Sequence, residues 1–165
     1  MPPLAFYGGF EFAANRITEE YKLPRNTRNS VKHALTAASI YSALRASSID
    51  KTSAEGIVLA LGFFNEKLET YIKVGHRDSL GEQCKDLHNN WAGIVAAEWR
   101  LTQAERKSLP SIIAGLAETG TLMLRASEVP LQVAPQNADA RTWFDGRKPA
   151  ISKQVVGALD NTPSP

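Results

Sequence analysis

The sequence predicts an all-α protein: a compact bundle of about five helices with an extended C-terminal tail. Of the 165 residues, 43% are hydrophobic and 22% are charged, which is enough apolar material for a globular core. Strand signals are almost absent, because no Asn-Gly or Asp-Gly hairpin turn lies between alternating apolar runs. Helix formers and helix start signals recur instead over residues 5–127.

Apolar spacing predicts the first two helices. One runs from about Phe10 to Tyr21, with apolar residues every four positions, and Pro24 stops it. The next runs from Thr27 to Ala46 and has two apolar stripes. The first stripe contains Val31, Leu35 and Ala38, and the second contains His33, Ala37, Ile40 and Leu44. A helix that is apolar on two sides usually lies in the centre of a bundle.

The third helix is predicted to start at Thr52, because Thr52 and Glu55 have the spacing of a capping box. It is expected to end near Gly75. Its apolar stripe has five positions: Ile57, Leu61, Phe64, Leu68 and Ile72. A polar loop is expected to follow from Gly75 to Gln83.

The fourth helix is predicted from Lys85 to Arg100. Its inward-facing residues are Leu87, Trp91, Ile94 and Val95. Thr102 and Glu105 have the spacing of a second capping box, which opens a short turn. Pro110 fits the first position of the last helix. The apolar residues of that helix are Ile112, Ile113, Leu116 and Leu124.

The composition changes at Val129, so we divide the chain into a helical domain, residues 1–128, and an extended or disordered tail, residues 129–165. Five of the nine prolines lie in this tail, and apolar periodicity is lost there. Trp143 and Phe144 form the one predicted docking point of the tail on the helical body. The alternative is that the whole tail is a plain linker.

Composition also excludes several classes of function. The net charge is +2 and no basic run exceeds two residues, so we expect no nucleic-acid partner. Arg25, Arg28 and Lys32 form a modest basic cluster, which a solvated helix start explains. The single cysteine, Cys84, excludes an internal disulfide and a multi-cysteine zinc site. No signal-peptide pattern is present, and the longest apolar run, Ile57 to Phe64, is too short to span a membrane.

The stretch Asp86-Leu-His-Asn-Asn-Trp-Ala-Gly93 does not fit a plain bundle helix. At about 100° per residue, Asp86, Asn89, Asn90 and Gly93 lie on one helix face. Asp and Asn favour caps over helix interiors, and Gly costs about 1 kcal/mol relative to Ala. One explanation is a polar binding face. The other is that Asp86 caps the helix and the asparagines form a solvated first turn.

His33, Glu66 and His88 are further candidates. His33 lies on an apolar helix face, and Glu66 lies beside an apolar stripe, where a raised pKa would suit a general acid or base. The simpler explanations are a satisfied core histidine and a solvated carboxylate paired with a lysine. If helix packing joins these residues with Asp86, they form an acid–base or metal site, with metal and cofactor left unidentified. Cys84, one turn before His88, is a weak indication of a thiolate–imidazole pair.

Three segments together resemble a poorly characterised bacterial helical domain that occurs in secreted and toxin-like proteins. They are Asn29-Ser-Val-Lys-His33-Ala34, Asn65-Glu66 and Asp86-Leu-His-Asn-Asn90-Trp-Ala-Gly93, and the resemblance covers about residues 26–100. The domain's patterns are Asn-Ala-x-Arg-His-Ala, His-Glu and Asp-Leu-His-Asn-Asn-x-x-Gly, in that order. Lys32 departs from the Arg of the first pattern. Asn65 replaces the His of the second, which weakens any metal site that would use that histidine.

The resemblance implies that the three segments cluster into one polar pocket. The expected catalytic residues are His33, Glu66 and Asp86. The expected binding residues are Asn29, His88, Asn89 and Asn90. The first hypothesis is a bacterial effector-like or accessory hydrolase, cytoplasmic or exported without a cleaved signal, with a cognate immunity or chaperone protein as partner. The second is a non-catalytic helical interaction or structural protein, such as an adaptor of a secretion system or phage particle.

Overall fold

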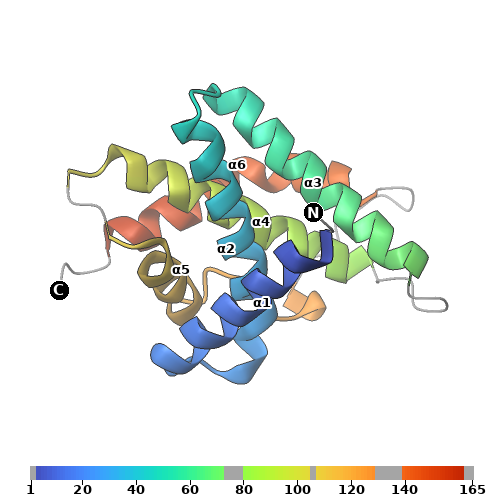
Figure 1. Cartoon of the computed structure of the whole chain (residues 1–165), viewed down its shortest axis with the longest axis horizontal. Helices are drawn as coiled ribbons and strands as arrows, with labels where there is room; N and C mark the ends of the chain where they lie inside the picture. Colours follow the sequence, from blue (N-terminus) through green and yellow to red (C-terminus); the bar gives the residue numbers. More distant parts are fainter. Residues whose placement is uncertain (1–2, 73–79, 105–106, 129–138, 162–165) are drawn as a thin grey trace.

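The computed structural model describes residues 3–72, 80–104, 107–128 and 139–161, including all their side chains except those of residues 3–8, 65–72 and 126. These residues form six α-helices and two short 3₁₀ helices, and they contain no strand (Figure 1). The α-helices are α1 (Pro3–Glu20), α2 (Arg28–Ala46), α3 (Lys51–Ile72), α4 (Leu80–Thr102), α5 (Leu109–Glu118) and α6 (Ala140–Asp160). The 3₁₀ helices are η1 (Arg25–Thr27) and η2 (Ala126–Glu128). The prediction of an all-α bundle is confirmed.

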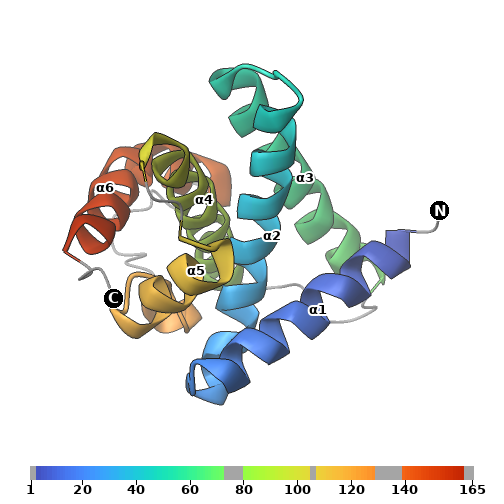
Figure 2. The ribbon, with the colours of Figure 1, turned by 60° about the vertical axis from the view of Figure 1, so that its left-hand side comes forward.

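Helix α4 lies at the centre of the bundle, between α2 on one side and α6 on the other (Figure 2). All residues from 84 to 94 are buried, and since they make about three helical turns, α4 is enclosed all round. An enclosed helix is normally apolar on every side. In α4, however, five of these buried residues are polar or charged: Lys85, Asp86, His88, Asn89 and Asn90.

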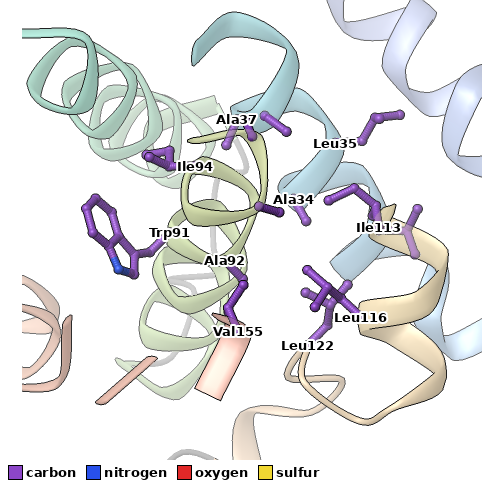
Figure 3. Close-up of a cluster of buried hydrophobic side chains, with 14 of the residues drawn as sticks. Ala34, Leu35, Ala37, Trp91, Ala92, Ile94, Ile113, Leu116, Leu122 and Val155 are labelled. Atoms are coloured by element: carbon purple, nitrogen blue, oxygen red, sulfur yellow. The ribbon is translucent and has the colours of Figure 1, made fainter. Parts of the chain in front are cut away.

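Helices α2 and α4 approach each other closely at Ala34 and Gly93. A Cβ atom at residue 93 would lie 2.1 Å from the carbonyl oxygen of Ala34, so no side chain fits there unless the helices move apart. Apolar side chains from α2, α4, α5 and α6 form the core around this contact (Figure 3). Members labelled in that view include Ala34, Ala92, Ile94, Leu116 and Val155.

The predicted helix starts agree with the structure at α2 and differ at α1 and α3. Helix α1 begins at Pro3 rather than near Phe10. Helix α3 begins at Lys51, because the Asp50 carboxylate accepts a hydrogen bond from the Ser53 N–H at 3.0 Å. The predicted cap at Thr52 is therefore wrong.

Helix α4 begins at Leu80, five residues earlier than predicted, so the expected loop is wrong over residues 80–83. Residues 75–79 of that loop lie outside the described residues. Because Asp86 lies six residues inside α4, the explanation that it caps the helix is wrong. At the other end, Ser108 caps α5 by accepting a hydrogen bond from the Ser111 N–H at 3.3 Å. The predicted cap at Thr102 instead donates its hydroxyl to the Trp99 carbonyl at 2.7 Å, and Glu105 lies outside the described residues.

The expectation of an extended tail is wrong for residues 139–161, which contain α6 and its caps. Pro149 inside this helix costs about 3 kcal/mol. Five large apolar side chains outweigh that cost at roughly 1.5–3 kcal/mol each. They are Trp143, Phe144, Ile151, Val155 and Leu159. The docking of Trp143 and Phe144 is confirmed, since Phe144 is fully buried and meets Trp91 edge-on at 6.0 Å. The other tail residues lie outside the described ranges.

Helix α3 turns the described part of its apolar stripe outward. Ile57, Leu61 and Phe64 are 42%, 49% and 65% exposed, whereas the buried apolar residues among the described side chains of this helix are Ala54 and Val58. The other two positions of the stripe have side chains outside the described part. We call the exposed row of Ile57, Leu61 and Phe64 the α3 face.

Candidate functional site

His33 of α2 and Asp86 of α4 meet in the interior of the bundle. His33 Nε2 lies 3.5 Å from Asp86 Oδ1, and the two side chains are 13% and 9% exposed. His33 directly precedes Ala34, so the contact between Ala34 and Gly93 holds the helices at the separation that this pair requires. A carboxylate beside an imidazole orients the ring and stabilises the imidazolium when the ring takes up a proton.

Lys85 adds a buried positive charge to this pair. Its Nζ lies 3.6 Å from Asp86 Oδ1 and forms an ion pair with Glu82, one turn earlier in α4. Burial alone would lower the pKa of Lys85. The hydrogen bond to Glu82 and the negative charges of Asp86 and Glu82 outweigh that effect and raise the pKa. Lys85 therefore stays an ammonium ion at neutral pH.

Asn90 lies one turn after Asp86, opposite Gly62 of α3. Asn90 Nδ2 is 2.8 Å from the position that a Cβ atom at residue 62 would take, so the glycine leaves the room that this amide occupies. The Asn90 side chain is largely buried. Helices α2, α3 and α4 therefore meet around the group of His33, Asp86 and Asn90.

His88 and Asn89 face a different part of the molecule, the segment after α5. Asn89 Nδ2 donates to the Met123 carbonyl and Asn89 Oδ1 accepts from the Met123 N–H, each at 2.9 Å. Ser30 Oγ donates to the same carbonyl at 2.6 Å. His88 Nε2 lies 2.9 Å from the Thr121 carbonyl oxygen, and since that oxygen can only accept, Nε2 carries the proton. The predicted binding residues His88 and Asn89 thus bind the chain's own backbone.

Of the two other predicted site residues, Asn29 and Glu66, the structure describes the side chain of Asn29 but not that of Glu66. Asn29 is exposed at the second position of α2. The backbone of Glu66 belongs to α3, but its side chain lies outside the described part, so its catalytic role stays a prediction. Among the described residues, no group of three or more His, Cys, Asp or Glu side chains is arranged to hold a metal ion.

Two other sequence features have structural roles. Cys84 is fully buried, and burial raises the pKa of its thiol to about 11, which contradicts a thiolate–imidazole pair at neutral pH. Arg28 and Lys32 of the basic cluster both pair with Glu11 of α1. Glu11 therefore offsets one of the two positive charges of this pair.

Sequence reasoning missed Lys85, Gly62 and Ser30. The pairing of Lys85 with Glu82 has the i, i+3 spacing of a helical ion pair, but the predicted helix starts at Lys85 and so does not include Glu82. Gly62 and Ser30 have no linear signal, because each acquires its role from a distant element that packs against it.

Comparison with family models, with curated protein sequences and with solved structures gives no match for this chain. Within the described ranges, none of the helices combines the length and the apolar character needed to cross a membrane. The geometry around His33 and Asp86 is therefore the main basis for a functional conclusion.

Proposed function

We propose that this protein is a bacterial effector-like hydrolase whose reaction centre is the His33–Asp86 pair. The observation that supports it most is the 3.5 Å contact between an imidazole and a carboxylate from separate helices. Both side chains keep some exposed surface, so a bound molecule can exchange protons with them. The resemblance of three segments to a helical domain of secreted, toxin-like bacterial proteins supports the effector assignment.

In the proposed reaction, His33 accepts a proton from water while the water oxygen attacks an electrophilic centre of the substrate. Asp86 positions the ring and stabilises the imidazolium that forms. The imidazolium then returns its proton to the leaving group. Glu66 keeps its predicted role as a further acid–base residue in this proposal.

The test is a panel of three chromogenic substrates, a p-nitrophenyl ester, a peptide p-nitroanilide and bis(p-nitrophenyl) phosphate. His33→Gln and Asp86→Asn preserve side-chain size while removing the proton acceptor or the negative charge. Each is expected to lower kcat/KM about 10²–10⁴-fold, as for loss of a general acid–base group. The matched control is Asp145→Asn, because Asp145 is 62% exposed and pairs weakly with Arg141 at 3.8 Å. This control is expected to keep full activity.

Circular dichroism and thermal melting establish that the variants keep the fold. The proposal fails if the native chain hydrolyses none of the three substrates. It also fails if folded His33→Gln and Asp86→Asn both retain the native rate.

The α3 face favours a second candidate function, a non-catalytic helical interaction protein. Contiguous apolar side chains on a surface mark interaction sites more often than isolated ones do. Ile57, Leu61 and Phe64 follow one another at helical spacing and are all exposed. Under this alternative, Leu61→Gln removes partner binding, whereas His33→Gln leaves it intact.

A further inference from the structure

Asn90 is a largely buried residue whose side-chain amide makes no hydrogen bond to another described residue. The residue is only 7% exposed. Neither amide atom is among the fully buried side-chain atoms that lack a partner, so the donor and the acceptor keep contact with solvent. A bound molecule can therefore reach both amide atoms of Asn90, in contrast to the amide of Asn89, which is already paired with Met123.

The position of Asn90 connects this amide to the proposed reaction centre. Asp86 precedes it by one helical turn, so the two side chains are neighbours on α4. Gly62 of α3 faces it, and a Cβ atom at that position would come within 2.8 Å of Asn90 Nδ2. Because residue 62 has no side chain, the Asn90 amide has room to occupy its position beside Asp86.

The neighbouring Asn89 shows what an asparagine side chain binds in this protein. Its two polar atoms pair with the N–H and the carbonyl of one residue, Met123, both at 2.9 Å. An asparagine offers one acceptor and one donor side by side, which matches the N–H and C=O edge of a residue in an extended chain. An isolated trans amide, as in an N-acetyl sugar, points its N–H and C=O in opposite directions. It therefore cannot make both bonds to a single side-chain amide.

We propose that Asn90 binds the main-chain N–H and C=O of one residue of a peptide substrate, so that the His33–Asp86 pair hydrolyses a peptide bond. This inference rests on the proposed function and specifies its substrate class. The water oxygen bonds to the carbonyl carbon, and its proton passes to His33. The C–N bond then breaks, and the imidazolium gives its proton to the leaving nitrogen. The products are one carboxylic acid and one amine, and no co-reactant other than water is needed.

Binding is tested by NMR on the ¹⁵N-labelled full chain. The probe is a pool of N-acetylated, C-amidated pentapeptides of mixed sequence, and the comparison probe is a mixture of four ribonucleoside monophosphates. The peptide pool is expected to shift the Asn90 side-chain NH₂ signals and to leave those of Asn89 in place, because Asn89 is already paired. The nucleotides are expected to shift neither.

Two glycine variants on one helix provide a matched pair. Gly62→Ala places a methyl group against Asn90 Nδ2 and is expected to weaken peptide binding about tenfold, the loss of one well-made hydrogen bond. Gly56→Ala is the control, because nothing lies within 4 Å of its added Cβ, and it is expected to bind like the native chain. Asn90→Asp, which removes the donor at nearly constant size, is expected to lose binding as Gly62→Ala does.

The inference is overturned if the peptide pool leaves the Asn90 signals unmoved, if the nucleotides shift them instead, or if Gly62→Ala and Asn90→Asp bind peptides normally. Mass spectrometry of the same samples separates this inference from the proposed function. Peptides that bind through Asn90 but stay intact contradict hydrolysis and support the recognition. Hydrolysis of a chromogenic ester that depends on His33, without peptide binding, supports hydrolysis and contradicts the recognition.

Discussion

Neighbouring polar residues of α4 contact different elements, because other parts of the chain pack against α4 on all sides. Asp86 meets His33 of α2, whereas Asn89 binds Met123 after α5. Asn90 points at Gly62 of α3. At this scale the sequence indicated which residues are unusual for a helix interior. It did not indicate that they serve two sites, one structural and one proposed to be catalytic.

His88 makes the stability of the fold dependent on pH. Burial lowers its pKa below the ordinary value of 6.5 and outweighs the opposing hydrogen bond to Thr121, while Arg147 lowers the pKa further and Glu128 raises it. Above the unfolded-state pKa the histidine is neutral in both states and costs nothing. As pH falls below that value, the unfolded chain takes up the proton first, so stability is lost towards the lower folded-state pKa.

We expect the free energy of unfolding of the native chain to fall between about pH 7.5 and pH 5.5 by more than that of His88→Gln. Urea denaturation at several pH values measures the difference. The other titrating groups are common to both chains, so the comparison isolates His88. Identical pH profiles for the two chains would show that His88 does not titrate differently on folding.

At the scale of elements, the contact between α2 and α4 positions the candidate site. Gly93 permits this approach, and the polar groups of both helices then meet within a few ångströms. The period of apolar residues predicted α2 correctly. The sequence does not reveal the early start of α4, because the stretch Gly75–Gln83 is polar and looks like a loop. The first turn of this helix is stabilised by packing against other elements rather than by local hydrophobicity.

Gly93→Ala is expected to destabilise the protein by several kcal/mol, because its Cβ would lie 2.1 Å from the Ala34 oxygen and the helices must separate. The gain in helix propensity, about 1 kcal/mol, is too small to compensate. Gly56→Ala is the matched control: it adds a methyl group in open space on α3 and is expected to stabilise by up to about 1 kcal/mol. Chemical denaturation of both variants measures the contrast. Equal stability changes would contradict the tight contact.

At the scale of the whole molecule, α6 completes the bundle. It covers α4 opposite α2, and Trp91 Nε1 donates to Ser152 Oγ at 2.9 Å while Trp99 Nε1 donates to Asp160 at 2.9 Å. The prolines predict an extended tail, yet one interior proline costs a helix only about 3 kcal/mol, through a lost hydrogen bond and a clash with the preceding turn. The burial of the apolar face of α6 against α4 provides the larger free energy.

The bundle leaves the α3 face uncovered, and this predicts how substitutions there behave. Leu61→Gln and Phe64→Gln are each expected to change the free energy of unfolding by less than about 0.5 kcal/mol, since both side chains are largely exposed. Val58→Ala, on the buried side of the same helix, is expected to cost about 2 kcal/mol. Urea denaturation at two protein concentrations measures these values. A large, concentration-dependent loss in Leu61→Gln would mean that a second copy already covers the face in solution.

The sequence by itself determined the all-helical class, the bounds of α2 and the residues that are unusual for a helix interior. These follow from local periodicity and propensity, which act over a few turns. Only the tertiary structure decided which partner each polar residue meets, because the partners are far apart in the chain: Asn89 and Met123 are separated by 34 residues. It also decided that α3 exposes Ile57, Leu61 and Phe64, the described part of its most regular apolar stripe. An apolar stripe in the sequence shows that one helix face is apolar, but only tertiary packing determines whether another element covers that face.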